Sequence, residues 1–177
     1  MYQLRGKLSI VMPAYNEEAL IYNSIMQTLS IVEQFAPDLE IIAVNDGSKD
    51  ETKQEIERAI RDDAKQPHPV VPGMRVSGTR IKLVTSNKNR GKGNAIISGI
   101  SQAEGDYIAF VDADLELNPA QLEGYLKKMQ ESGSDVVIGC KFHKDSELHY
   151  PFVRKVISLG YYICLLYTSP SPRDYAA

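Results

Sequence analysis

The sequence has little excess charge and little cysteine, and each shortage excludes a class of protein. Twenty Lys and Arg residues stand against 23 Asp and Glu residues, a net charge of -3, so no global positive field would attract nucleic acid. The two cysteines, Cys140 and Cys164, have no short metal-binding spacing, and no secretory segment begins the sequence. We therefore expect a protein of the reducing cytosol, without a disulfide framework and without a nucleic-acid partner.

Long hydrophobic runs are missing as well. No uninterrupted stretch of about 18 apolar residues occurs, so no segment is expected to cross a bilayer by itself, and peripheral attachment to a membrane stays open. What is present is a globular composition, with 43% hydrophobic and 24% charged residues over 177 positions. This length suits one domain with a buried core and is too short for two.

The C-terminal end differs in kind from the rest. Residues 164–174 read Cys-Leu-Leu-Tyr-Thr-Ser-Pro-Ser-Pro-Arg-Asp and resemble one reading frame of a transposon-type sequencing adapter. We therefore interpret 164–177 as an artefactual tail and 1–163 as a single domain truncated at its C-terminus. A natural Ser/Pro-rich tail is the alternative.

Short apolar runs alternate with amphipathic stretches along the chain. Strands are predicted at 7–12, 39–44, 81–85, 107–111 and 135–139. Helices are predicted after an Asn16 cap, after a Ser48/Glu51 capping box, over 91–103, and after the Asn118-Pro119 pair. The stretch 61–78, with several Pro and Gly residues, is predicted to be an exposed loop. This alternation predicts an α/β fold with a mostly parallel sheet and helices on both faces.

Polar clusters follow four of the predicted strands. They are Pro13-Ala14-Tyr15-Asn16-Glu17, Asn45-Asp46-Gly47-Ser48, the stretch 87–93, and Asp112-Ala113-Asp114. Ligands of such sheets bind at the carboxyl ends of the strands, so we expect these four loops to converge on one rim.

Asp112 and Asp114 are the candidate metal ligands. They flank one residue at a strand end, where a turn out of the sheet can aim both carboxylates at one point, and Glu116 continues the spacing as a third candidate. Carboxylate oxygens with open coordination positions suit Mg²⁺ or Mn²⁺ bridging a diphosphate. A solvated acidic turn before Asn118 is the structural alternative.

Asp46 and Tyr15 are candidates for contact with a nucleoside. The Asp46 carboxylate would either accept hydrogen bonds from a base or ribose or cap the following helix. Ser48 already has the spacing of that helix cap, which leaves Asp46 available for a nucleoside. Tyr15 would stack on a base or simply pack at the strand end.

Gly91 and Lys92 are candidates for phosphate binding. Arg90-Gly91-Lys92-Gly93-Asn94 places small residues and two cations at a predicted helix start, where backbone N–H groups and the helix dipole favour anions. It matches neither a Walker loop nor a dinucleotide fingerprint. An ordinary surface turn is the alternative.

Together these four clusters, in this order and spacing, resemble family 2 glycosyltransferases. Over residues 7–163 the sequence is similar in particular to the polyprenol (dolichol) phosphate mannosyl- and glucosyltransferases. The resemblance implies a GT-A-type (Rossmann-like) nucleotide-sugar-binding catalytic domain over 1–163. It also implies that a nucleoside lies against Pro13, Ala14, Tyr15, Glu17 and Asp46, and that Asp112 lies near the ribose and phosphates of the nucleotide sugar. Asp112, Asp114 and Glu116 would hold Mg²⁺ or Mn²⁺.

The resemblance also implies an acceptor site for a lipid phosphate. Arg154 and Ser158 match the Arg-x-x-x-Ser element that grips this phosphate in the subfamily, and Lys141 stands where an Arg is usual. A lysine lacks the planar guanidinium fork, so bidentate binding at that point is not expected. The basic, amphipathic stretch 150–163 would lie on the cytoplasmic face of a membrane or pack on the sheet.

The implied reaction is an inverting transfer of a hexose from a GDP- or UDP-sugar to a polyprenyl phosphate. The acceptor phosphate is already anionic near neutral pH, so the transfer needs no general base. Two alternatives remain: a family 2 enzyme with a sugar or protein hydroxyl as acceptor, and an inactive fragment that binds nucleotide sugar.

Overall fold

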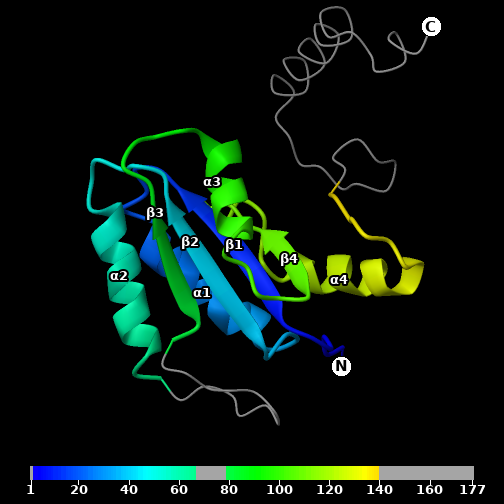
Figure 1. Cartoon of the computed structure of the whole chain (residues 1–177). Helices are drawn as coiled ribbons and strands as arrows, with labels where there is room; N and C mark the ends of the chain where they lie inside the picture. Colours follow the sequence, from blue (N-terminus) through cyan, green and yellow to red (C-terminus); the bar gives the residue numbers. More distant parts are fainter. Residues whose placement is uncertain (1, 67–78, 140–177) are drawn as a thin grey trace, which may run out of the picture. The chain divides into compact units, whose positions relative to one another are not determined.

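Four of the predicted apolar runs pair as strands of one parallel sheet. The structure is a computed structural model that describes residues 2–66 and 79–139. The strands are β1 (Leu8–Ala14), β2 (Leu39–Asn45), β3 (Ile81–Thr85) and β4 (Tyr107–Phe110), in the order β3-β2-β1-β4 (Figure 1). Every residue of β2 is buried, as expected of an inner strand covered on both faces.

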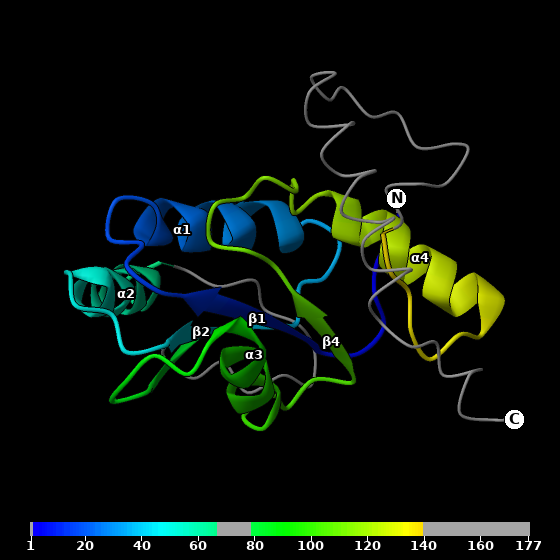
Figure 2. The same ribbon diagram turned by 90° about the horizontal axis from the view of Figure 1, so that it is seen from above.

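Helices cover both faces of this sheet, as the sequence predicts. They are α1 (Ile21–Val32), α2 (Thr52–Asp63), α3 (Lys92–Ile100) and α4 (Gln121–Ser132). Figure 2 shows α1 and α2 on one side of the sheet and α3 on the other. The larger core cluster joins Ile25 of α1 and Leu122 of α4 to Ile10 of β1, and the smaller one packs Ala95 of α3 on Val11.

The predicted fifth strand is wrong. Residues 135–139 have no strand conformation, and Val136 and Ile138 are 73% and 76% exposed. Their β-branched side chains favour a strand, but a strand forms only when its backbone pairs with a neighbour. This segment pairs with none of the described strands.

The predicted helix caps are partly wrong. Asn16 and Ser48 cap nothing, because α1 and α2 begin later, at Ile21 and Thr52, with no side-chain cap. The Asn118 side chain does cap the approach to α4, since its Oδ1 accepts the Ala120 N–H at 2.9 Å.

The predicted loop over 61–78 also begins too early. Helix α2 runs to Asp63, whose buried carboxylate accepts hydrogen bonds from the backbone and guanidinium of Arg80. Arg80 also pairs with Glu33 at 2.8 Å. The rest of the predicted loop, 67–78, lies outside the described residues, as does the predicted tail at 164–177. The division of the chain at residue 163 therefore stays a prediction.

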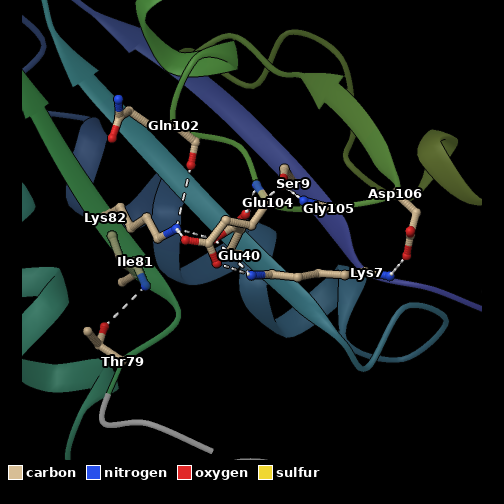
Figure 3. Close-up of polar contacts among 10 residues, drawn as sticks. All are labelled: Lys7, Ser9, Glu40, Thr79, Ile81, Lys82, Gln102, Glu104, Gly105 and Asp106. Atoms are coloured by element: carbon tan, nitrogen blue, oxygen red, sulfur yellow. Dashed lines mark hydrogen bonds and ion pairs between the residues drawn. The ribbon is translucent and has the colours of Figure 1, made fainter. Parts of the chain in front are cut away.

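An ionic cluster around one buried carboxylate links the amino ends of the strands. The carboxylate of Glu40 on β2, 4% exposed, accepts hydrogen bonds from Ser9 Oγ at 2.6 Å and from the Glu104 N–H at 2.8 Å (Figure 3). It also pairs with Lys7 at 3.2 Å and Lys82 at 2.9 Å. Because the partners come from β1, β3 and the α3–β4 loop, one side chain links most of this end of the sheet.

The cluster keeps Glu40 ionised far below the usual range. Burial by itself would raise its pKa, but the hydrogen bonds from Ser9, Lys82, the Glu104 N–H and Lys7 outweigh it and lower the pKa to about 2. A carboxylate with a depressed folded-state pKa contributes stability that is present above its unfolded pKa, near 4.5, and is lost as the pH falls toward 2.

Replacement of Glu40 therefore tests the cluster through pH. The difference in free energy of unfolding between wild type and Glu40→Gln should be largest above pH 4.5, on the order of 3 kcal/mol, and should shrink toward pH 2. Urea unfolding at several pH values measures it. Glu57→Gln, which removes a 42% exposed partner of Lys53, is the matched control and should show a small difference at every pH. An equally flat profile for both variants would contradict the cluster's role.

Helix α3 lies unusually close to the sheet. A Cβ on Gly99 would come within 3.1 Å of Val44 Cγ2 and closer still to Val11 Cγ1. The missing side chain thus lets the helix backbone pack directly on β1 and β2, and this fixes the height of α3 above the strands.

Replacing glycine by alanine at two helix positions should distinguish the effect of this close packing on stability from the effect of helix propensity. Gly99→Ala should lower the free energy of unfolding by about 1–3 kcal/mol, because the core on that face must shift. Gly124→Ala is the control: at that exposed α4 position an added Cβ would meet nothing within 4 Å, so alanine should raise stability by roughly 0.5–1 kcal/mol. Unfolding midpoints that move the same way in both variants would exclude the close approach as the cause.

Candidate active site

The loops after β1 and β2 are held together by reciprocal hydrogen bonds. The Asn16 N–H donates to Ser48 Oγ at 3.0 Å, and Asn16 Oδ1 accepts the Lys49 N–H at 2.9 Å. The Glu17 N–H donates to Thr52 Oγ1 at 2.8 Å. Asn16 and Ser48, predicted as helix caps, thus serve to join two strand-end loops into one rim.

Asp46 fastens a third loop to this rim. Its buried carboxylate accepts the Arg90 N–H at 3.1 Å and the Gly91 N–H at 2.8 Å, just before α3 begins. Gly47 beside it has φ +71°, and a Cβ there would lie 2.6 Å from the Asn89 nitrogen, so the two loops are in direct backbone contact. Asp46 therefore sets the position of the α3 N-terminus instead of capping α2.

The fourth loop carries Asp112 and Asp114. Its middle carbonyl, on Ala113, accepts a buried hydrogen bond from Ser24 Oγ of α1. Leu115 has a positive φ of 50°, and Asn16 with φ 57° is the other non-glycine residue of this kind within 2–66 and 79–139. Such backbone conformations cost free energy and cluster at functional sites. Ser24 thus holds the acidic turn in place from α1, and the turn leads into a strained backbone conformation at Leu115.

The four loops enclose one pocket of about 300 Å³. Its lining residues are Pro13, Ala14, Tyr15, Glu17, Asp46, Asn89, Gly91, Lys92, Ala95, Asp112, Ala113 and Asp114. All eight residues that the resemblance and the loop pattern assign to nucleotide-sugar binding are in this set, and so is Asp114. The predicted convergence at the carboxyl edge of the sheet is therefore present.

Three lining residues were not predicted as individual ligand contacts, although Asn89 and Ala113 lie in loops that were predicted to converge. Ala95 faces inward from the first turn of α3, and Ala113 is the small residue between the two acids. Asn89 lies in the polar stretch after β3, and its Oδ1 accepts the Gly91 N–H at 2.8 Å. Ser24 was missed as well, because its role depends on a contact between α1 and a loop 89 residues away.

The pocket carries more negative than positive charge. Four carboxylates line it, those of Glu17, Asp46, Asp112 and Asp114, against one ammonium, that of Lys92, among the described lining residues. Lys92 Nζ lies 2.6 Å from Asp112 Oδ1. An anion such as a diphosphate would be repelled from this pocket unless a cation accompanied it.

The donor set fits a divalent cation held in part by its substrate. Mg²⁺ is commonly bound through one or two carboxylates together with substrate phosphates, and Asp112 and Asp114 line the pocket as such a pair. Glu116 is not among the lining residues, and its N–H donates to Asp114 Oδ1 at 3.1 Å. No group of three such side chains meets at one point in the described part of the chain. The three-acid metal site therefore stays a prediction.

The predicted acceptor residues, Lys141, Arg154 and Ser158, lie outside the described residues. Within the part of the chain that the structure describes, no helix has the length and apolar character needed to cross a membrane.

Comparison with known proteins identifies the family. The model of glycosyl transferase family 2 matches residues 9–168, which is most of the chain. The protein belongs to this family.

Curated relatives indicate which members of the family this chain resembles. An undecaprenyl-phosphate 4-deoxy-4-formamido-L-arabinose transferase of Enterobacter sp. (strain 638) is 36% identical over 131 residues, 74% of this chain and 36% of the relative. A protein of the same name from Photorhabdus laumondii is 32% identical over 170 residues, 90% of this chain and 48% of the relative. The chain thus spans between a third and a half of the length of these relatives.

Solved structures share the fold. A mannosyltransferase of Pyrobaculum calidifontis, in complex with GDP-Man and Mn²⁺, superimposes with a TM-score of 0.57 at 23% identity over 71% of this chain and 33% of its own. S. aureus TarS 1-349 does so with a TM-score of 0.54 at 23% identity, over 78% of this chain and 40% of its own. The fold is accordingly the α/β, GT-A-type fold that the sequence predicts.

The anchoring role of Asp46 is open to a direct test. In Asp46→Ala the amide of Arg90 should exchange with solvent at least about tenfold faster, because both carboxylate acceptors are lost. Hydrogen exchange followed by NMR measures it. The Glu104 amide, which Glu40 holds at the other end of the sheet, is the internal control and should keep its rate. Equal acceleration of both amides would indicate general destabilisation instead.

Proposed function

We propose that this chain is the nucleotide-sugar-binding catalytic domain of an inverting glycosyltransferase that moves a hexose to a polyprenyl phosphate. The observation that carries the proposal is the pocket in which loops from four strand ends bring Asp112 and Asp114 together with the predicted nucleoside and phosphate contacts. Membership of family 2 supports the reaction class, and the names of the two relatives support a lipid phosphate as acceptor.

The donor binds along the rim in this proposal. Tyr15, 40% exposed, offers a ring face to the base, and the free lone pairs of Asp46 accept from base or ribose while its carboxylate holds the α3 loop. The diphosphate lies toward Lys92 and the N-terminus of α3, where backbone N–H groups and the helix dipole favour an anion. The proposal includes both GDP- and UDP-sugars as donors.

Asp112 and Asp114 hold Mg²⁺ or Mn²⁺ against the diphosphate. When bound, the metal stabilises the negative charge that develops on the departing nucleoside diphosphate. The excess of carboxylates in the pocket supports this assignment, since without added positive charge the donor would meet net repulsion.

The acceptor phosphate oxygen attacks the anomeric carbon from the side opposite the diphosphate. The new carbon–oxygen bond forms with the acceptor's electron pair, the bond to the diphosphate oxygen breaks with its pair, and the configuration inverts. No proton has to move, because the acceptor is already an anion. Lys141, Arg154 and Ser158 bind this phosphate in the proposal, and the protein works at the cytoplasmic face of a membrane.

Loss of a pocket carboxylate should abolish transfer. Asp112→Ala and Asp114→Ala should each lower the rate at least about a hundredfold, because charge on the leaving group is no longer offset. The assay supplies membranes containing polyprenyl phosphate with radiolabelled GDP-mannose, UDP-glucose or a nucleotide derivative of 4-deoxy-4-formamido-L-arabinose. Labelled sugar in the organic extract measures transfer and also identifies the donor.

Glu131→Gln is the matched control, since Glu131 is a 59% exposed acid on α4 outside the pocket and should keep the wild-type rate. Wild-type transfer by Asp114→Ala would contradict the metal-holding role. Label that appears on a water-soluble acceptor, with none in the organic extract, would contradict the lipid phosphate as acceptor.

A further inference from the structure

The ion pair between Lys92 and Asp112 joins the one cation among the described lining residues to a predicted metal ligand. Lys92 Nζ lies 2.6 Å from Asp112 Oδ1, with the two side chains 58% and 48% exposed. The contact occupies a carboxylate that, under the proposed function, a divalent cation would need. It also occupies the ammonium that a diphosphate would need.

We propose that Lys92 acts as the counter-ion of Asp112 while no metal is bound. When a divalent cation binds, the Lys92 ammonium leaves the Asp112 carboxylate and becomes free to contact the diphosphate. This inference rests on the proposed function, and it couples two events: binding of the metal to Asp112 and release of the Lys92 ammonium for contact with the phosphate.

The strength of the pair suits such an exchange. An ion pair between half-exposed side chains contributes little free energy, because solvent screens the attraction. Lys92 therefore offsets the charge of Asp112 while the pocket is empty, yet it yields to an ion of twice the charge that two carboxylates hold. A fully buried pair would resist separation far more strongly.

The surroundings allow the side chain to move while its backbone stays in place. The residue before it, Gly91, is held by the carboxylate of Asp46 at 2.8 Å. At Gly91 and Gly93, on either side of Lys92, a Cβ would meet nothing within 4 Å, and the Lys92 side chain itself is 58% exposed. The ammonium can swing toward a phosphate without shifting the helix.

The exchange changes the net charge that an anionic ligand meets in the pocket. With Lys92 on Asp112, no unpaired cation remains among the described lining side chains, and the carboxylates of Glu17 and Asp114 repel an anion. With a divalent cation on the two aspartates, the pocket gains that charge and Lys92 as well. Nucleotide affinity should consequently rise steeply with the metal concentration.

The test measures binding of Mn²⁺ alone to the full chain, by calorimetry or by the electron paramagnetic resonance signal of free Mn²⁺. Lys92→Met should bind Mn²⁺ about three- to tenfold more tightly than wild type, because a competing positive charge is gone. Lys92→Arg keeps the charge and should bind it as wild type does. Lys53→Met is the matched control, since Lys53 is a 52% exposed, ion-paired lysine outside the pocket and should leave Mn²⁺ affinity unchanged.

The second measurement is binding of GDP and UDP at saturating Mn²⁺. Here Lys92→Met should bind the nucleotide about tenfold more weakly, because the freed ammonium is missing. Opposite signs for metal and nucleotide distinguish the exchange from damage to the fold, which would weaken both.

Two results would overturn the inference, and they are distinguishable. If wild type binds Mn²⁺ and nucleotide but Lys92→Met binds Mn²⁺ no more tightly, Lys92 does not compete with the metal, and the proposed function stands. If neither wild type nor Lys92→Met binds Mn²⁺, either alone or together with GDP or UDP, the inference fails together with the metal role of Asp112 and Asp114.

Discussion

The arrangement of the site depends on one carboxylate that binds backbone, that of Asp46. By accepting the N–H groups of Arg90 and Gly91, it joins the end of β2 to the start of α3, and so places Lys92 opposite Asp112. The close packing of Gly99 on Val11 sets how far α3 stands from the sheet. Together these contacts fix one end and the height of the helix, and so set the shape of the pocket on the side of α3.

The two ends of the sheet differ in how their charges are balanced. At the amino ends, Glu40 is matched by Lys7, Lys82 and hydrogen-bond donors, and its negative charge is balanced within the fold. At the carboxyl ends, acids outnumber cations around the pocket, and the balance is left for a ligand to supply. The ion pairs that stabilise the fold and the candidate binding pocket therefore lie at opposite ends of one sheet. This agrees with the general position of ligands in parallel α/β folds.

The sequence predicted the sheet, the helices on both faces and the grouping of the four loops, because hydrophobic periodicity and strand-end position depend on local spacing. It failed where the outcome depended on partners. Residues 135–139 have strand-forming side chains but no neighbouring strand among the described residues, and Asn16 and Ser48 have capping side chains that bind another loop instead. Ser24 gave no signal at all, since a serine on a helix is ordinary until a carbonyl from a distant loop meets it.

The left-handed backbone at Leu115 bears on attempts to engineer this protein. A branched side chain in that conformation stores strain of roughly 1–3 kcal/mol directly after Asp114, while Ser24 holds the same turn from behind. Glycine at this position would release the strain and favour the folded chain, but it would also loosen the turn that aims the two acids. Selection for heat resistance alone would therefore favour changes here that loosen the candidate active site.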